Sequence, residues 1–343
     1  MKYVKFGSTG LTVSQFCLGA WHLPGTGVKD RFGVEEVDKE TFAKVVGKAY
    51  DLGINFIDGA NRYHGRMSTA DLDHVGNSEK LLGQVLKGYP RESLVVATKV
   101  RGPMAPFPNG QGLSRKHIMW QIGESLRRLE LDYVDLYQIH WEDELTPKIE
   151  TLRALNNLVD RGLVRYIGES NHNPAGVVEF MELAQRYGME GFASMQEPYN
   201  LLERQKESET LPVAKKYGMA VMAYVPIAQG VLSGKYLGGT EKGSRATYIA
   251  QMASQYFTPE VNAAVSSLVA IAGEKGCTLP QLALAWMLHK QEQLGITIVP
   301  ILGITKISHL EDNVGALDVK LSGDEMKRLE EMAATAKMGP ASY

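Results

Sequence analysis

The sequence predicts a single (β/α)8 barrel, the TIM-barrel class, preceded by an N-terminal β-hairpin. Eight short apolar runs rich in β-branched residues alternate along the chain with segments of helical period. Each interval between successive runs fits one strand and one helix, and only the last interval is longer. No proline- or serine-rich linker divides the chain, so we expect residues 1–343 to form one domain.

The first residues predict the hairpin, and the apolar runs after them predict the barrel strands. The segment "YVKF" turns at "STG" into "LTVS", and this hairpin is expected to close the bottom of the barrel. The stretch 225–258 predicts an extended loop before further helices. The predicted strands end at Ala20, Asp58, Lys99, His140, Ser170, Gln196, Tyr224 and Leu302.

Helical periodicity between the strands predicts the outer layer of the barrel. Ser114 is a typical N-cap residue, and Asn173 precedes Pro174 at a first helical position. Glycines such as Gly53 and Gly188 end several of these segments. The predicted helices cover 38–52, 78–86, 114–129, 149–160, 174–187, 209–217 and a long region from 259 onward.

A doubly wound open sheet also alternates strands and helices, and it is the main alternative to the barrel. Such a sheet normally carries a G-x-G-x-x-G fingerprint after its first strand. The glycines of "GAWHLPGTG" have the wrong spacing, and no other strand is followed by this motif. The pattern therefore favours the barrel.

Composition and charge exclude several classes of partner. Lys and Arg total 37 against 39 Asp and Glu, so a net charge of −2 gives no electrostatic case for nucleic acid or an anionic membrane. The N-terminus lacks a hydrophobic signal core, and no apolar run reaches the roughly 20 residues of a membrane span. Cys17 and Cys277 lie far apart, which offers neither a disulfide framework nor metal-ligand spacing. We expect a soluble, cytoplasmic protein.

Polar side chains stand at the carboxyl ends of the predicted strands, where barrels of this class place their chemistry. Lys99 ends the apolar run "LVVAT", and a lysine is costly to bury there unless it is paired. Asp58, on the neighbouring strand, is a suitable partner. The full set at this rim is Asp58, Lys99, His140, Ser170, Asn171, Gln196 and Tyr224.

Tyr63, Lys99, Asp58 and His140 together suit proton donation to a carbonyl oxygen. An adjacent ammonium favours the phenolate, so we expect Lys99 to lower the pKa of Tyr63. Asp58 is expected to keep Lys99 charged and oriented, while His140 directs the substrate oxygen. Neither a G-x-S-x-G elbow nor a catalytic cysteine setting is present, so the nucleophile is expected to be a hydride from a cofactor.

Seven blocks of sequence resemble the aldo-keto reductase family in the order typical of that family. They are "GINFIDGANRYHG", "VVATKV", "LDYVDLYQIHWED", "RYIGESNHNP", "SMQEPYNLLER", "AYVPIAQGVLSGKY" and "PILGITKISHLEDNVGALDVKLS". The resemblance is to the branch with potassium-channel β subunits and aryl-alcohol dehydrogenase-like reductases. It implies the (β/α)8 fold, NADPH as the usual cofactor and a catalytic tetrad of Asp58, Tyr63, Lys99 and His140.

The same resemblance implies a set of cofactor contacts. Ser170, Asn171 and Gln196 are similar to the residues that contact the nicotinamide carboxamide, and Tyr224 to the residue that stacks on the ring. The segment after Tyr224 resembles a loop over the pyrophosphate, and the residues from Gly303 onward resemble the adenosine site. The implied set is Ala20, Trp21, Asp58, Ser170, Asn171, Gln196, Tyr224, Val225, Pro226, Ile227, Ala228, Gln229, Gly230, Lys235, Arg245, Gly303, Thr305, His309, Asp312 and Asn313.

The predicted function is NADPH-dependent reduction of a small aldehyde or ketone to an alcohol. Substrate-facing candidates are Trp21, His22, Trp141, the loop "RGPMAPFPNGQG" and the C-terminal "KMGPASY". Two alternatives stay open: a regulatory module that binds NADPH as a redox signal, and an alcohol dehydrogenase working in the oxidative direction. The channel β subunits carry Asn where this chain has His140, which counts against the regulatory role.

Two other interpretations of the sequence, a sugar isomerase and a metal site, find less support. A metal-dependent sugar isomerase on the same barrel would need carboxylate and histidine ligands at several strand ends, and these are missing. The insertion after Tyr63 contains His64, Asp71 and His74 without a ligand spacing, so we expect no metal. The insertion is expected to form a pocket wall or surface flap. The sequence leaves open the physiological substrate, the choice between NADPH and NADH, and the oligomeric state.

Overall fold

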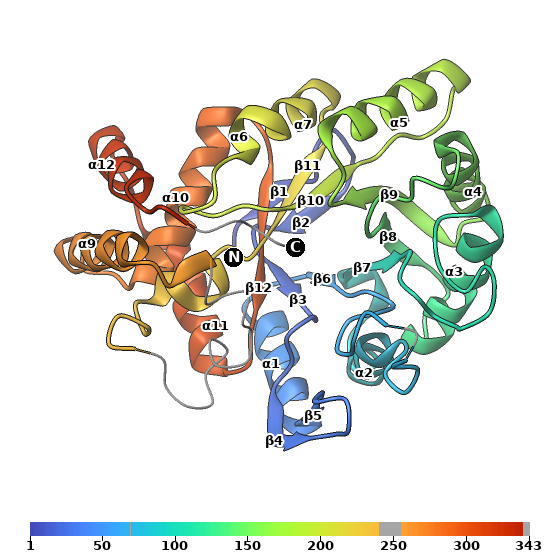
Figure 1. Cartoon of the computed structure of the whole chain (residues 1–343), viewed down its shortest axis with the longest axis horizontal. Coiled ribbons are helices and arrows are strands. Elements are labelled where there is room, and N and C mark those ends of the chain that lie inside the picture. The colour runs from blue at the N-terminus through green and yellow to red at the C-terminus, as the bar shows by residue number, and fades with distance from the viewer. Residues whose placement is uncertain (69, 240–254, 339–343) are drawn as a thin grey trace.

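A computed structural model describes residues 1–68, 70–239 and 255–338, and it contains a closed barrel of eight parallel strands (Figure 1). Each strand pairs with its neighbour along the chain, and the last strand pairs with the first. The predicted barrel is therefore confirmed. Its strands are β3 (Cys17–Gly19), β6 (Phe56–Asp58), β7 (Val95–Val100), β8 (Val134–Ile139), β9 (Val164–Ser170), β10 (Ser194–Pro198), β11 (Ala220–Tyr224) and β12 (Ile298–Gly303).

Helices surround the barrel and bury their apolar faces against its strands (Figure 1). They are α1 (Lys39–Asp51), α2 (Asn77–Leu86), α3 (Arg115–Leu129), α4 (Lys148–Asp160), α5 (Pro174–Tyr187), α6 (Lys206–Glu209), α7 (Leu211–Tyr217), α9 (Pro259–Lys275), α10 (Leu279–Leu294), α11 (Ile307–Val314) and α12 (Gly323–Ala334). Short 3-10 turns are η1 (Arg91–Ser93), η2 (Ala228–Ser233) and η4 (Gly315–Asp318). None of the helices in the described ranges is long and apolar enough to cross a membrane.

Most predicted helices match within a residue or two, but the one expected at 209–217 is divided. Here α6 ends at Glu209 and α7 begins at Leu211. The break follows from Pro212, which has no N–H to continue a preceding helix and fits the first turn of a new one.

The N-terminal hairpin closes the bottom of the barrel, as predicted. Its strands β1 (Tyr3–Lys5) and β2 (Thr12–Ser14) pair antiparallel. Phe6 is fully buried among the inward-facing residues of the barrel, and its ring meets that of Phe56 edge to face at 5.4 Å. Gly7 follows with φ +60°, where a Cβ would lie 2.5 Å from the Gly218 carbonyl oxygen, so only glycine fits.

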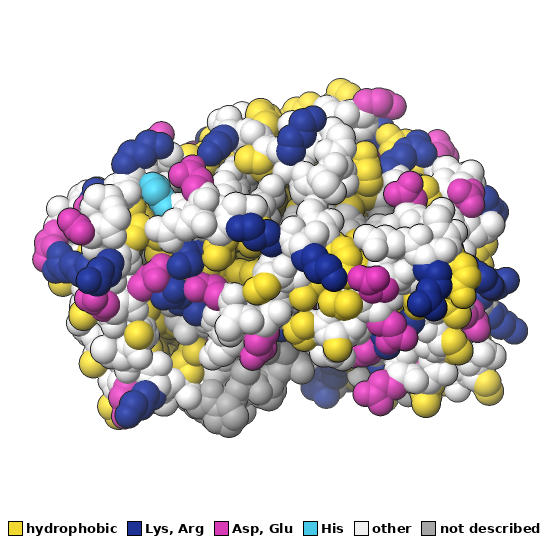
Figure 2. Space-filling model, turned by 90° about the horizontal axis from the view of Figure 1, so that it is seen from above, with side chains coloured by type: hydrophobic (Ala, Val, Ile, Leu, Met, Phe, Trp, Pro, Cys, Tyr) yellow, Lys and Arg dark blue, Asp and Glu magenta, His cyan; other side chains and the backbone are white. Residues whose placement is uncertain are grey.

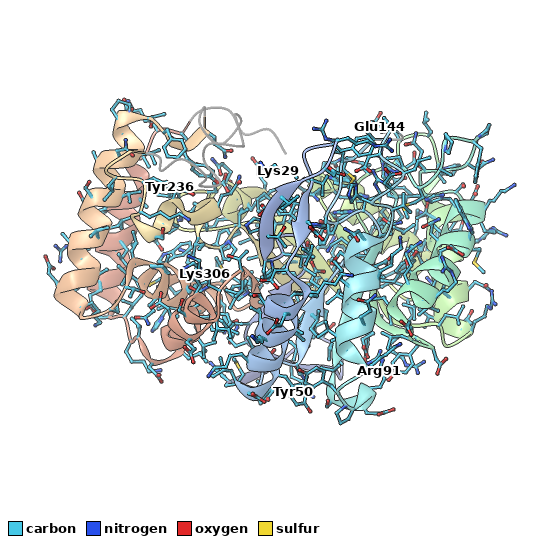
Figure 3. The ribbon with its side chains drawn as sticks, turned by 90° about the horizontal axis from the view of Figure 1, so that it is seen from below. Lys29, Tyr50, Arg91, Glu144, Tyr236 and Lys306 are labelled. Atoms are coloured by element: carbon cyan, nitrogen blue, oxygen red, sulfur yellow. The ribbon has the colours of Figure 1, made fainter. Side chains whose placement is uncertain are left out.

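A second hairpin, β4 (Gly25–Lys29) with β5 (Glu35–Val37), was not expected. It stands at the end of the barrel opposite the plug, where Figure 3 places Lys29 and Glu144, far from Tyr50 and Arg91. The insertion after Tyr63 is tied to it: the His64 Nε2 lies 2.9 Å from the Glu35 carbonyl oxygen. Hairpin and insertion are thus joined to each other.

The face of the molecule in Figure 2 carries both signs of charge without a large field of either. Figure 2 shows lysines and arginines interspersed with aspartates and glutamates across the face in view. This distribution agrees with the formal balance of −2.

Candidate active site

Three of the predicted catalytic side chains meet in one buried cluster at the carboxyl end of the barrel. The Lys99 Nζ donates to the Asp58 Oδ2 at 2.6 Å and to the Tyr63 hydroxyl oxygen at 2.8 Å. A third contact reaches the Gly59 carbonyl oxygen at 3.0 Å. Because β6 and β7 are neighbours, their carboxyl ends bring Asp58 and Lys99 together.

The second oxygen of Asp58 is held by two side-chain amides. Gln138 on β8 donates to the Asp58 Oδ1 at 3.0 Å, and Gln196 on β10 donates to the same atom at 3.2 Å. Both glutamines are buried. Gln138 was not singled out from the sequence, although it lies on the inward-facing side of "YVDLYQIH", two residues before His140.

His140 lies beside this cluster at the end of β8. Its ring meets that of Tyr63 edge to face at 5.5 Å and stacks on Trp141 at 3.7 Å, with an angle of 14°. Burial and the charges of Lys99 and Arg101 lower the pKa of His140 well below its ordinary value. A neutral imidazole at physiological pH can donate one hydrogen bond to a substrate oxygen.

The expected effect of Lys99 on the phenol is wrong in direction. Burial, together with the Asp58 carboxylate, raises the pKa of Tyr63 well above its ordinary value. Burial also lowers the pKa of Lys99, which Asp58 partly opposes. Desolvation of the buried phenol is the largest cause, and the Asp58 carboxylate acts in the same direction, since both disfavour the charged phenolate. Tyr63 therefore keeps its proton at neutral pH, and its contact with Lys99 is positioned to stabilise phenolate as it forms.

Next to the cluster, Asn171 joins three strand ends. Its side-chain amide donates to the His140 carbonyl oxygen at 3.2 Å and to the Ser170 Oγ at 2.9 Å. Its Oδ1 accepts from the Tyr224 hydroxyl at 2.7 Å and keeps a second lone pair for another donor. Asn171 has a left-handed backbone with φ +58°, a strained conformation that is common at ligand-binding sites. The Ser170 hydroxyl donates to the Gln196 carbonyl oxygen at 2.9 Å.

The segment after β11 has an unusual backbone. Val225, Ala228, Gln229 and Gly230 have φ values of 49°, 48°, 56° and 98°. Successive residues with such angles turn backbone N–H groups towards one side, where they can bind an anion. A Cβ on Gly230 would lie 3.3 Å from the Lys235 Nζ, so an ammonium group accompanies this concavity.

Lys306 and His309 lie at the start of α11. Burial, followed by the charges of Lys306 and Lys235, lowers the pKa of His309. Gly303 ends β12 with open space in front of it, since a Cβ there would meet no atom within 4 Å. The strand end, the η2 segment and α11 thus border one region.

The remaining predicted cofactor residues differ in how far the structure supports a contact. Both carboxylate oxygens of Asp312 accept from the Thr278 hydroxyl, at 3.0 and 3.1 Å, so this side chain ties α11 to α10. Trp21 is 50% exposed. Arg245 lies outside the described residues. Buried or partly buried positions near the strand ends are Ala20, Pro226, Ile227, Thr305 and Asn313.

Comparison with known proteins decides the family. The family model described as "Aldo/keto reductase family" matches residues 15–334. The chain belongs to the aldo/keto reductase family. As a member, it is an NAD(P)H-dependent oxidoreductase that acts on small molecules and binds a nicotinamide cofactor.

Relatives of this aldo/keto reductase carry names of two kinds. A protein of Arabidopsis thaliana, provisionally named voltage-gated potassium channel subunit beta, is 32% identical over 351 residues and covers 100% of both chains. A protein of Schizosaccharomyces pombe with a similar provisional name is 34% identical over 336 residues, covering 95% of this chain and 91% of the relative. Another from that yeast, provisionally named aryl-alcohol dehydrogenase, is 32% identical over 352 residues and covers 96% of this chain and 95% of the relative.

The polar groups of this aldo/keto reductase fit a nicotinamide dinucleotide. Asn171 has a lone pair for an amide N–H, the η2 backbone and Lys235 fit a diphosphate, and Lys306 adds positive charge beside His309. Among residues 1–68, 70–239 and 255–338, no group of three or more His, Cys, Asp or Glu side chains is placed to hold a metal ion.

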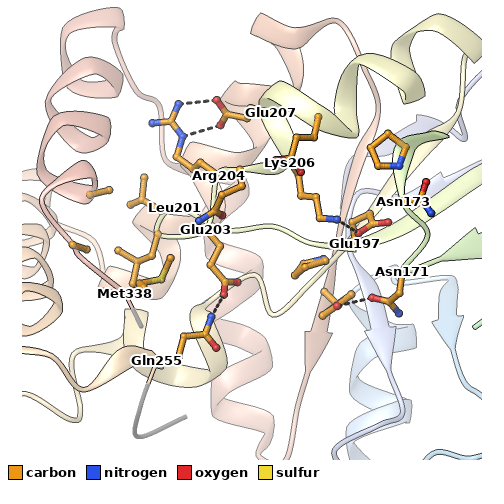
Figure 4. Close-up of a pocket in the computed structure, with 18 of the residues that line it drawn as sticks. Asn171, Asn173, Glu197, Leu201, Glu203, Arg204, Lys206, Glu207, Gln255 and Met338 are labelled. Carbon is orange, nitrogen blue, oxygen red and sulfur yellow. Dashed lines mark hydrogen bonds and ion pairs between the residues drawn. The ribbon is translucent and has the colours of Figure 1, made fainter. Parts of the chain in front are cut away.

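A cavity of about 920 Å³ opens beside this region (Figure 4). Trp141, Asn171 and Tyr224 lie at the edge nearest the catalytic cluster. Farther out the wall is formed by the segment after β10, which contributes Lys206, and by residues that follow α12, including Met338. Trp141 and Met338 belong to the substrate-facing regions expected from the sequence, whereas Trp21 does not line this cavity.

Proposed function

We propose that this aldo/keto reductase reduces aldehydes or ketones to alcohols with NADPH, and that Tyr63 is the proton donor. One observation carries the proposal: the buried Lys99 Nζ contacts both the Tyr63 hydroxyl at 2.8 Å and the Asp58 carboxylate at 2.6 Å. When bound, NADPH supplies the hydride for the carbonyl carbon.

The four catalytic side chains have separate roles in this proposal. Tyr63 holds its proton until the carbonyl oxygen gains negative charge and becomes basic enough to take it. Lys99 then stabilises the phenolate, while Asp58 keeps Lys99 charged and fixed in place. Neutral His140 donates to the substrate oxygen and orients the carbonyl group, and the stacked Trp141 limits rotation of the imidazole.

The chain would hold the cofactor through three groups of residues. Asn171, with Ser170 and Gln196 behind it, binds the carboxamide, and Tyr224 packs on the ring. The backbone of 225–230 and Lys235 bind the diphosphate. Lys306 provides the charge that favours a 2′-phosphate, and therefore NADPH over NADH, and His309 beside it supplies a hydrogen-bond donor. Gly303, Thr305, Asp312 and Asn313 are proposed to border the adenosine, and Arg245 the diphosphate. Ala20, Trp21 and Asp58 remain predicted cofactor contacts at the strand ends.

The substrate is expected to approach Tyr63 from the edge of the cavity at Trp141, Asn171 and Tyr224, where aromatic rings lie beside polar groups, as in binding sites for small carbonyl compounds. The outer wall is largely charged and includes Glu203, Arg204 and Glu207. We further propose that residues 1–343 act as a single domain. The cysteine-poor sequence supports a cytoplasmic setting.

A panel of aldehydes and ketones, including 4-nitrobenzaldehyde, tests this function when run with NADPH and with NADH. Loss of the reduced-nicotinamide absorbance with several carbonyl compounds, faster with NADPH, is expected. Running the matching alcohols with NADP⁺ measures the oxidative direction.

The names of the relatives favour a regulatory NADPH-binding module as a second candidate. Tight binding of NADPH without turnover across the whole panel would support that role and overturn the enzymatic one. The presence of His140 beside the Tyr63 ring supports the enzymatic role, because an imidazole there can serve a reacting oxygen.

A further inference from the structure

Behind the strand ends that border the active site, a second cluster of ionisable groups is buried. Glu169 on β9, Glu197 on β10 and His172 are all 2% exposed or less. The His172 Nδ1 lies 3.2 Å from the Glu169 Oε2, and the Lys206 Nζ lies 2.7 Å from the Glu197 Oε2. Figure 4 shows the ion pair of Glu197 with Lys206 beside Asn171. None of these groups takes part in the proposed chemistry.

Glu169 and Glu197 face outward from the barrel wall. Strand residues alternate between the two faces, and the residues that precede them, Gly168 and Gln196, face into the barrel, where Gln196 donates to the Asp58 Oδ1. His172 packs on the same outer side, with its ring edge to face against Phe180 of α5 at 5.9 Å. The cluster therefore lies between the barrel and its helices.

The contacts of His172 bracket Asn171. The His172 Nδ1–H donates to the Ser170 carbonyl oxygen at 3.0 Å, and the Glu169 carboxylate pairs with the same nitrogen at 3.2 Å without forming a hydrogen bond. Ser170 and His172 are the two chain neighbours of Asn171, so this hydrogen bond closes the turn in which Asn171 adopts its left-handed conformation. Glu169 holds the imidazole ring in place, and the ring holds the backbone turn at Asn171 in place.

A purely structural role explains this arrangement poorly. A buried ion pair is often no more stabilising than apolar side chains of the same size, because each ion loses its hydration. The surroundings here, which include Phe180, suit an apolar pair. The carboxylate and imidazole instead supply a directed hydrogen bond to the backbone beside Asn171, which apolar side chains cannot provide.

We propose that His172, held by Glu169, is a positioning residue that fixes Asn171 for contact with the nicotinamide carboxamide. This inference rests on the proposed function, since it takes Asn171 as a cofactor contact. The ring of His172 does not touch the cofactor and acts only through the turn.

Two substitutions of similar shape separate the hydrogen bond from packing. The amide nitrogen of His172→Asn can replace the Nδ1 donor, whereas His172→Leu has the same branched outline without a donor. The measurements are the Kd of NADPH and the Kd of adenosine 2′,5′-bisphosphate, which lacks the nicotinamide. We expect His172→Leu to weaken NADPH by about tenfold, the value of one well-placed hydrogen bond. Its affinity for the bisphosphate should not change, and His172→Asn should bind both ligands as the wild type does.

A double variant covers the case in which His172→Leu fails to fold with Glu169 left unpaired. Glu169→Leu with His172→Leu replaces both charged groups by apolar ones, and it should show the same selective loss of NADPH affinity. Equal weakening of both ligands, unchanged NADPH affinity, or equal loss in His172→Asn and His172→Leu would each overturn the positioning role. Failure of the wild type to bind NADPH would overturn the proposed function first, and this inference with it.

Discussion

The ion pair between Asp58 and Lys99 can be tested through its energetics. Their side chains are 1% and 0% exposed, with the nitrogen 2.6 Å from the carboxylate oxygen. Lys99→Met would leave a buried carboxylate with only the amides of Gln138 and Gln196 as donors. In this variant we expect the buried Asp58 carboxylate to take up a proton rather than stay charged. Protonating a carboxyl group lowers the unfolding free energy by about 1.4 kcal/mol for each unit by which the pH exceeds the ordinary carboxyl pKa.

The expected loss of unfolding free energy in Lys99→Met is therefore about 4 kcal/mol at pH 7, within the range measured when one partner of a buried pair is removed. Because the proton is easier to obtain in acid, the loss should shrink to about 1.5 kcal/mol at pH 5. Urea unfolding of the variant and the wild type at both pH values measures this difference. The double variant Asp58→Leu, Lys99→Met is the matched control, and it should regain most of the stability at pH 7.

Both variants should lose reductase activity by at least about 10²-fold, the usual contribution of general acid catalysis. A Lys99→Met protein as stable as the wild type at pH 7 would refute the reasoning, because the carboxylate would then be solvated. A loss of equal size at both pH values would also refute it, since the cost would then come from packing and not from charge.

Three further predictions concern the plug, the second buried cluster and the diphosphate region. Phe6→Ala should lower the unfolding free energy by about 3–5 kcal/mol in urea titrations, since Phe6 is fully buried in the barrel; a loss below 1 kcal/mol would mean that the hairpin is not packed there. Burial raises the pKa of Glu197 from 4.5 to about 7, so the native state binds more protons than the unfolded state and stability falls as pH rises. This group should contribute a loss of about 2.5 kcal/mol between pH 5 and pH 8, seen as a steeper pH dependence of unfolding in the wild type than in Glu197→Gln. Lys235→Met should raise the Kd of NADPH at least about tenfold, and a fluorescence titration showing unchanged affinity would remove Lys235 from the diphosphate site.

Much of the barrel is encoded in local patterns that sequence reasoning can use. The inner strands are continuous apolar runs that end in a polar residue, as in "LVVATK", and caps such as Ser114 and Asn173 mark helix starts. The β4–β5 hairpin has no such signal, because all residues of Gly25–Lys29 are exposed and lack an apolar face. Sequence periodicity detects burial, and this hairpin has little.

The residues of the catalytic cluster were predictable because the topology alone brings strand ends together. Their electrostatics were not. The pKa of Tyr63 depends first on burial and then on Asp58, and only the structure shows that Tyr63, Asp58 and Lys99 are all buried. Gln138 was missed because the sequence does not distinguish a glutamine that binds a site residue from any other polar residue in a strand. Its partner, Asp58, is known only from the structure. Glu169 and His172 were missed because their contact crosses a left-handed turn at Asn171.

The central claim is that Tyr63 gives the proton while Lys99 stabilises the phenolate that remains. The most direct test is the rate of NADPH consumption with 4-nitrobenzaldehyde in Tyr63→Phe, measured beside the Kd of NADPH for the same variant. The account predicts turnover reduced by at least about 10²-fold with the affinity for NADPH retained. Turnover equal to that of the wild type, in a variant that lacks only the hydroxyl group, would contradict it.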